Sequence, residues 1–172
     1  MLNSLRIVRG LRFVAVLSTV LALGACAKNT AANGGLDGAG GLGAGGVARP
    51  GSQQDFVVNV GDRVFFLEDQ SDLTGQAQST LSKQAQWLRQ YPRYTITVEG
   101  HADERGTREY NIALGARRAQ AVRDYLMAQG IPAGRMRTIS YGKERPVATC
   151  NDESCWTQNR RAVTVLNGAA AS

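Results

Sequence analysis

The sequence predicts an α+β domain, a two-layer sandwich in which helices pack on one face of a mixed four-stranded sheet. Two long segments repeat apolar side chains at helical spacing, and shorter segments alternate apolar and polar residues as strands do. The order along the chain is strand, helix, strand, helix, strand, strand, which fits this architecture. We expect the domain to span residues 55–168, a length that can bury a single core.

The two helices are expected at residues 75–90 and 107–129. Tyr91-Pro92 ends the first helix, and Gly130 ends the second. The inner stripe predicted for the first helix is Leu73, Ala77, Leu81, Ala85 and Leu88. The inner stripe predicted for the second helix is Tyr110, Leu114, Ala121 and Tyr125.

The strands are shorter and follow turn signals. Residues 55–60 and 63–66 alternate with period two around Gly61-Asp62, so we expect two short strands or a hairpin there. Further strands are expected at residues 94–99, 136–140 and 161–166.

The N-terminal segment has the pattern of a secretory signal. Three arginines fall within residues 1–12, an apolar run follows at residues 13–23, and small residues come next. The run is shorter than the roughly 20 residues that a membrane-spanning helix needs. We therefore expect residues 1–25 to be a signal peptide that is removed.

Cys26 directly follows the small residues of this segment. The sequence Leu23-Gly24-Ala25-Cys26 resembles the lipobox of bacterial lipoproteins, which implies lipidation of Cys26 and anchoring in a membrane. Ala27, where inner-membrane retention would favour Asp, resembles the pattern of outer-membrane lipoproteins. Gly and Ala crowd residues 26–54, which are expected to form a lipidated N-terminus and a flexible tether.

The charge of the chain gives little support to nucleic-acid binding. The formal charge is +6, but it falls to +3 once the three arginines of the signal peptide are removed. The remaining basic residues are interleaved with acidic ones, so no stripe of one sign forms and no nucleic-acid partner is expected.

Cys150 and Cys155 bracket a short segment. In an exported chain, a disulfide between them is the favoured interpretation. A metal site is the alternative, but the single histidine, His101, is distant in sequence and there is no second thiol pair. We expect no metal and no other cofactor.

The loop at residues 100–106 joins the end of a strand to the start of a helix, where free N–H groups favour an anion. Helical geometry places Arg118 on the flank of the apolar stripe, on the side shared with Asn111. Asp103 is the natural partner for a guanidinium held there. The pair could be a salt bridge that ties loop to helix, or a clamp for an amino-acid head group with an ammonium and a carboxylate.

Five segments of the predicted domain carry a resemblance to a known family. The chain resembles the OmpA-like C-terminal domain family and, within it, the peptidoglycan-associated lipoproteins (Pal). The segments are 100–111 (GHADERGTREYN), 114–119 (LGARRA), 122–126 (VRDYL), 139–146 (ISYGKERP) and 158–163 (QNRRAV).

The resemblance implies non-covalent binding of peptidoglycan through the meso-diaminopimelate of its stem peptide. Asp103 and Arg118 match the positions that the family uses for this zwitterion. The other matched positions are Asp69, His101, Ala102, Asn111 and Leu114. One departure stands at Glu68, where the family commonly has an aromatic residue; its charge could rotate the strand end or add a carboxylate near the ligand ammonium.

The resemblance also implies partners and a location. The domain would face the periplasm, linking the outer membrane to the cell wall. It would cooperate with Tol proteins in envelope integrity and cell division, with TolB as the main expected partner and TolA as an additional candidate. No catalytic residues are expected. A wall hydrolase would need a nucleophile with a base or a metal triad, and the single histidine, with no ligand partners, supplies neither. A motor stator would carry a membrane helix ahead of the domain, and a porin would carry a barrel there. The sequence predicts neither feature, so neither class is expected.

Overall fold

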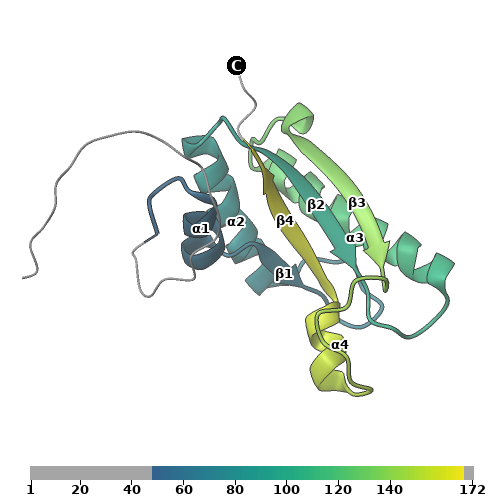
Figure 1. The fold of residues 1–172 in the computed structure, drawn as a ribbon. Coiled ribbons are helices and arrows are strands. Elements are labelled where there is room, and N and C mark those ends of the chain that lie inside the picture. Colours follow the sequence, from purple (N-terminus) through teal and green to yellow (C-terminus); the bar gives the residue numbers. More distant parts are fainter. Residues whose placement is uncertain (1–47, 169–172) are drawn as a thin grey trace, which may run out of the picture. The chain divides into compact units, whose positions relative to one another are not determined.

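The structure, a computed structural model, describes residues 48–168 (Figure 1). The predictions for residues 1–47, which include the signal peptide, Cys26 and most of the tether, lie outside the described residues. The helical elements are α1 (Gln53–Asp55), the π-helical turn Phe56–Val60, α2 (Gly75–Gln90), α3 (Arg108–Ala128), the 3-10 turn Ala133–Arg135 and α4 (Glu153–Asn159). The strands are β1 (Arg63–Phe65), β2 (Thr95–His101), β3 (Met136–Gly142) and β4 (Arg161–Asn167).

The four strands form one mixed sheet in the order β1-β4-β2-β3. β4 pairs antiparallel with both β1 and β2, whereas β2 and β3 are parallel and are joined through α3. Parallel neighbours need such a crossover, and α3 supplies it across the sheet (Figure 1). The predicted two-layer α+β class with a mixed four-stranded sheet is confirmed.

Helix α2 begins and ends where the sequence predicts. The Thr74 hydroxyl caps it by accepting a hydrogen bond from the Ala77 N–H at 3.2 Å. Its buried face joins the core beneath the sheet. The core cluster contains Phe56, Val64, Phe66, Ala77, Leu81, Ala85, Trp87, Leu88, Ile96, Val98, Ala119, Val122, Leu126, Ile131, Met136, Ala162 and Leu166.

Helix α3 ends within one residue of the predicted bounds on each side, but its inner stripe differs from the predicted one. Tyr110, placed at the centre of that stripe, is 44% exposed, and Ala121 and Tyr125 are only half-buried. Of the predicted stripe, Leu114 is buried as expected, and the other buried positions are Asn111, Gly115, Arg118, Ala119, Val122 and Leu126. The prediction was wrong for the two tyrosines and Ala121, because the buried face combines aliphatic residues with small and polar ones and does not include the aromatic residues.

A close approach of α3 to β2 explains why this face of the helix is buried. A Cβ atom added at Gly100 would lie 1.8 Å from the Gly115 carbonyl oxygen. A Cβ atom at Gly115 would lie 2.4 Å from the Ser140 Oγ. Glycine at both positions therefore lets the helix backbone rest on the strands beside the loop at residues 102–107.

The strand predicted at residues 55–60 was wrong, because this segment is helical. The Ser52 hydroxyl caps α1 by accepting from the Asp55 N–H, and Phe56 is fully buried against Trp87 with ring centroids 4.9 Å apart. A local cap and one buried aromatic residue outweigh the alternation. The packed domain also begins before residue 55, since Gly51 is buried and its carbonyl accepts a hydrogen bond from the Tyr94 hydroxyl.

Helix α4 was not predicted. Asp152 caps it by accepting from the Ser154 N–H at 2.8 Å, and a disulfide joins Cys150 to Cys155 across its first turn. Within residues 48–168, no helix is both long enough and apolar enough to cross a membrane.

Candidate functional site

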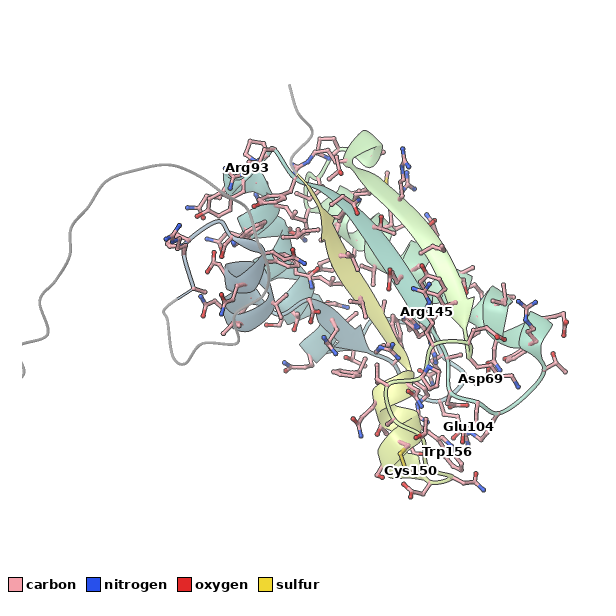
Figure 2. All side chains as sticks on the ribbon, viewed as in Figure 1. Asp69, Arg93, Glu104, Arg145, Cys150 and Trp156 are labelled. Atoms are coloured by element: carbon pink, nitrogen blue, oxygen red, sulfur yellow. A yellow bond between two sulfur atoms is a disulfide. The ribbon has the colours of Figure 1, made fainter. Side chains whose placement is uncertain are left out.

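The loop between β2 and α3 opens onto a cavity of about 270 Å³. Figure 2 shows Asp69, Glu104, Cys150 and Trp156 grouped at this end of the domain, with Arg93 at the opposite end. Loop residues and the first turns of α3 form much of the cavity wall. The lining residues are Glu68, Asp69, Asp103, Arg105, Gly106, Tyr110, Asn111 and Leu114.

Asp103 is buried at the cavity wall and is paired with two arginines. Arg105 donates to its two carboxylate oxygens from Nε at 3.2 Å and from Nη2 at 2.8 Å, and Arg160 Nη1 lies 3.4 Å from Oδ2. Burial raises the pKa of Asp103, but hydrogen bonds and charge from Arg105, with Arg160, outweigh burial and hold the pKa below its usual range. Asp103 is therefore a carboxylate at neutral pH.

Arg118 is fully buried and does not pair with Asp103. Its guanidinium donates to three backbone carbonyl groups: Gln70 from Nε at 2.8 Å, His101 from Nη1 at 2.8 Å and Leu67 from Nη2 at 3.1 Å. The expected partnership was wrong because main-chain oxygens satisfy the guanidinium first. Burial lowers the pKa of Arg118 to about 10, so it remains cationic.

His101 and Ala102 lie behind the cavity and do not line it. Ala102 is buried, and its N–H donates to the Gly142 carbonyl at 2.8 Å, which ties the loop to β3. The His101 ring is buried near Tyr141, and neither ring nitrogen has a hydrogen-bond partner among residues 48–168. Burial, with the positive charges of Arg161 and Arg145, lowers the pKa of His101 to about 4.

Asn111, Leu114 and Asp69 do line the cavity. Asn111 Nδ2 donates to the Arg105 carbonyl at 2.6 Å, which fixes the turn of the loop. Asp69 has a φ of 55°, in the left-handed region, and accepts a hydrogen bond from the Tyr110 hydroxyl. Asp69 thus faces the start of α3 from the opposite wall.

Four further residues line the cavity, and sequence reasoning did not select them as site residues. Glu68, which stands where the family commonly has an aromatic residue, lines the cavity and adds a carboxylate to it. Its Oε1 atom lies 2.8 Å from Arg105 Nη1. Arg105 and Gly106 belong to the same loop as Asp103, and that proximity was the available signal. Tyr110 was assigned to the core, which hid its place at the cavity.

The charge of the cavity favours a cationic group. Three of the described lining residues, Glu68, Asp69 and Asp103, carry carboxylates, and one, Arg105, carries a positive charge. An ammonium group would therefore be attracted to the cavity. Arg118 is not among the residues that line the cavity, and its guanidinium donates to the carbonyl groups of Leu67 and Gln70.

One cluster of potential metal ligands lies in the described part of the chain, at Cys150, Asp152 and Cys155. The sulfur atoms of Cys150 and Cys155 are joined to each other, with their Cα atoms 5.6 Å apart. A disulfide offers no thiolate to a metal ion. The cluster therefore does not provide a thiolate metal site in this state.

Comparisons with known proteins bear on this site and its fold. Residues 65–161 match the OmpA family. A peptidoglycan-associated lipoprotein from Agrobacterium fabrum is 64% identical over 158 residues, which cover 91% of this chain and 88% of that protein. One from Brucella abortus is 70% identical over 129 residues, which cover 75% of this chain and 76% of that protein.

Solved structures show the same fold. The crystal structure of the peptidoglycan-associated lipoprotein from Burkholderia pseudomallei has a TM-score of 0.63 and 40% sequence identity, and the match covers 66% of this chain and 98% of that chain. The C-terminal domain of Helicobacter pylori MotB has a TM-score of 0.59 at 22% identity, covers 63% of this chain and 86% of that chain, and supports the fold alone.

Proposed function

The chain belongs to the OmpA family and, within it, to the peptidoglycan-associated lipoproteins, and we propose that it links the outer membrane to the cell wall. Residues 1–25 are removed, Cys26 carries lipid, and residues 26–54 connect the anchor to the domain. Residues 55–168 face the periplasm and bind peptidoglycan without forming a covalent bond. The relatives' name and the cavity beside Asp103 support this proposal.

The observation that carries the proposal is a buried carboxylate at the wall of an acidic cavity. Asp103 is ionised, and Glu68 and Asp69 add negative charge around it. A side-chain ammonium such as that of meso-diaminopimelate suits this setting, because a charge-assisted hydrogen bond to a carboxylate is strong where water is limited.

The carboxylate of the same ligand requires Arg118. Its guanidinium is the planar fork that matches a carboxylate, but the carbonyl groups of Leu67 and Gln70 occupy it in this structure. We therefore expect residues 67–70 to withdraw when the ligand binds. Asn111 and Leu114 would form the side of the site, and His101 and Ala102 would support the loop from behind.

The partners and the absence of catalysis follow from the same proposal. The domain would bind the wall as a tether and would cooperate with Tol proteins during cell division. TolB is the main proposed partner, and TolA is an additional one. It would not cleave the wall. Incubation with purified sacculi should release no soluble fragments, and release above that of buffer would contradict a purely binding role.

The binding site is tested by a titration of the domain, followed by NMR, with a stem peptide that contains meso-diaminopimelate. Asp103→Asn should weaken binding at least about tenfold, because it removes the charge that meets the ammonium. Asp124→Asn, at an exposed carboxylate of α3, is the matched control and should bind normally. Equal binding by Asp103→Asn and the unaltered domain would contradict the site.

A second ligand tests the role of Arg118. A peptide with lysine in place of meso-diaminopimelate keeps the ammonium and lacks the terminal carboxylate. It should bind about tenfold more weakly, and equal binding would exclude Arg118 from recognition. The anchor is tested separately, because the mass of the mature N-terminus should show acylated Cys26 as the first residue.

A further inference from the structure

We propose that Arg105 is an internal competitor for the ligand ammonium, held on Asp103 by Glu68 and Trp156. This inference rests on the proposed function, because it concerns the same carboxylate. Arg105 takes up the side of Asp103 that lines the cavity, so a ligand ammonium must displace a positive group that belongs to the protein. Arg105 and the residues that hold it would then set the affinity and selectivity of the site.

The contacts of Arg105 match those of a bound cation. Its guanidinium meets Asp103 side-on, with one N–H group on each carboxylate oxygen, and its backbone N–H donates to Oδ1 at 3.2 Å. The third nitrogen, Nη1, lies 2.8 Å from Glu68 Oε1. Arg105, which itself lines the cavity, therefore bridges two of its carboxylates.

Trp156 of α4 provides the surface on which Arg105 rests. The Arg105 Cζ atom lies 4.1 Å from the centre of the Trp156 ring, within the range of a cation–π interaction. The indole N–H donates to the Glu104 carboxylate, so the ring is oriented from the loop as well. Trp156 directly follows Cys155, whose disulfide to Cys150 fixes the first turn of α4.

Asp103 has a second cation that does not face the cavity. Arg160 is buried, lies 3.4 Å from Asp103 Oδ2, and is also paired with Glu153. Loss of Arg105 would therefore leave Asp103 with a buried partner. The domain can release Arg105 from Asp103 without leaving the carboxylate uncompensated, which is what an exchange with a ligand ammonium requires.

The exchange should make the site select a ligand with a positive charge over a neutral analogue. An ammonium replaces the guanidinium with a group of equal charge, so the charge that faces Asp103 and Glu68 is unchanged. A neutral amide offers no charge in exchange, so it does not displace Arg105 and binds through the other contacts of the peptide alone. Competition by Arg105 would therefore lower the affinity for the charged ligand and would leave the weak affinity for a neutral analogue unchanged.

The experiment compares two ligands by calorimetry on the full domain: the meso-diaminopimelate peptide, and the same peptide with its side-chain amine acetylated. Arg105→Gln should bind the charged peptide about fivefold more tightly than the unaltered domain and the acetylated peptide equally well. Arg108→Gln, which removes a positive charge from the first turn of α3 outside the cavity, should change neither affinity.

A second variant tests the hold on Arg105. Trp156→Leu removes the cation–π contact and leaves Arg105 in place, and it should tighten binding of the charged peptide about twofold. Unchanged or weaker binding of the charged peptide by Arg105→Gln, or an equal gain for both peptides, would overturn the inference. If instead the unaltered domain fails to bind, or Asp103→Asn binds normally, the proposed function fails and the inference fails with it.

Discussion

The two ends of β2 lie in surroundings of opposite character. Near its start, Trp87 packs against Phe56, Tyr91 and Tyr94 with ring centroids 4.6 to 5.3 Å apart, and the buried side chains there are mainly apolar. At and beyond its last residue, here called the polar end, the chain buries charged and polar groups instead. These are His101, Asp103, Asn111, Arg118 and Arg160.

The difference separates two kinds of buried contact along one strand. Apolar contacts are numerous and non-directional, so the aromatic end tolerates small shifts in position. Buried polar groups must each find a particular partner, and an unsatisfied group is costly. The polar end therefore holds its groups by specific hydrogen bonds, and the proposed exchange with a ligand would replace some of them.

Trp87→Ala should lower the free energy of unfolding most, because it disrupts the aromatic end, the cluster of Trp87 with Phe56, Tyr91 and Tyr94. The substitution leaves a cavity beside Phe56 and removes the donor to Asp55 Oδ2, so the free energy of unfolding should fall by about 3–5 kcal/mol. Urea unfolding followed by far-UV circular dichroism measures this change. Met127→Ala, at an exposed position of α3, should cost less than about 1 kcal/mol. A small effect of Trp87→Ala would show that the aromatic end is not the main source of stability.

Arg118→Met should destabilise the polar end by about 3 kcal/mol. It leaves three carbonyl groups without their donor, and each costs about 1 kcal/mol or more. The matched control is Arg117→Met on the exposed side of the same helix, with an expected change below about 0.5 kcal/mol. The same urea titration applies to both variants. Equal stability of the two would show that the three hydrogen bonds of Arg118 do not stabilise the fold.

The elements that sequence reasoning predicted well are those fixed by local signals. Apolar residues at helical spacing and the Tyr91-Pro92 stop predicted the bounds of α2 correctly, and the structure adds a hydroxyl cap at Thr74. Residues 55–60 show the limit of such reasoning. Their period-two pattern indicated a strand, but burial of Phe56 against Trp87, far away in the sequence, favours a helix.

The site shows the same limit at the level of side chains. Asp69, Asp103, Asn111 and Leu114 were selected with the help of family resemblance, and all four line the cavity. The partner of Arg118 was not predictable, because carbonyl groups carry no side-chain signal in a sequence. The contact between Arg105 and Trp156 joins residues 51 positions apart, and only the fold brings them together.

His101→Leu should remove a pH dependence of the free energy of unfolding that arises at the polar end. The pKa of His101 is about 4 in the fold, below its usual 6.5, so the unfolded chain binds the proton more readily. Stability is therefore fully present above about pH 6.5 and falls by up to about 3 kcal/mol as the pH decreases toward 4.

Thermal unfolding between pH 4 and 7 measures the effect of His101. The groups that face its ring are Glu99 on the same strand, with a carboxylate oxygen 3.7 Å from Nε2, the cations Arg161 and Arg145, and Tyr141. All of them remain in His101→Leu, as does the backbone carbonyl that accepts from Arg118. The variant should lose most of the pH dependence in this range, and an unchanged dependence would assign it to other groups.

The disulfide should have the smallest effect of the four on stability. The disulfide between Cys150 and Cys155 closes a short loop, so it restricts the unfolded chain only slightly. Cys150→Ser together with Cys155→Ser should therefore lower the free energy of unfolding by about 2 kcal/mol. The loss should be confined to α4 and the polar end, because the aromatic end shares no contact with the loop among the described contacts. Hydrogen exchange should show faster exchange in residues 153–159 and unchanged protection around Trp87. Uniform loss of protection would mean that the two ends of β2 unfold as one unit.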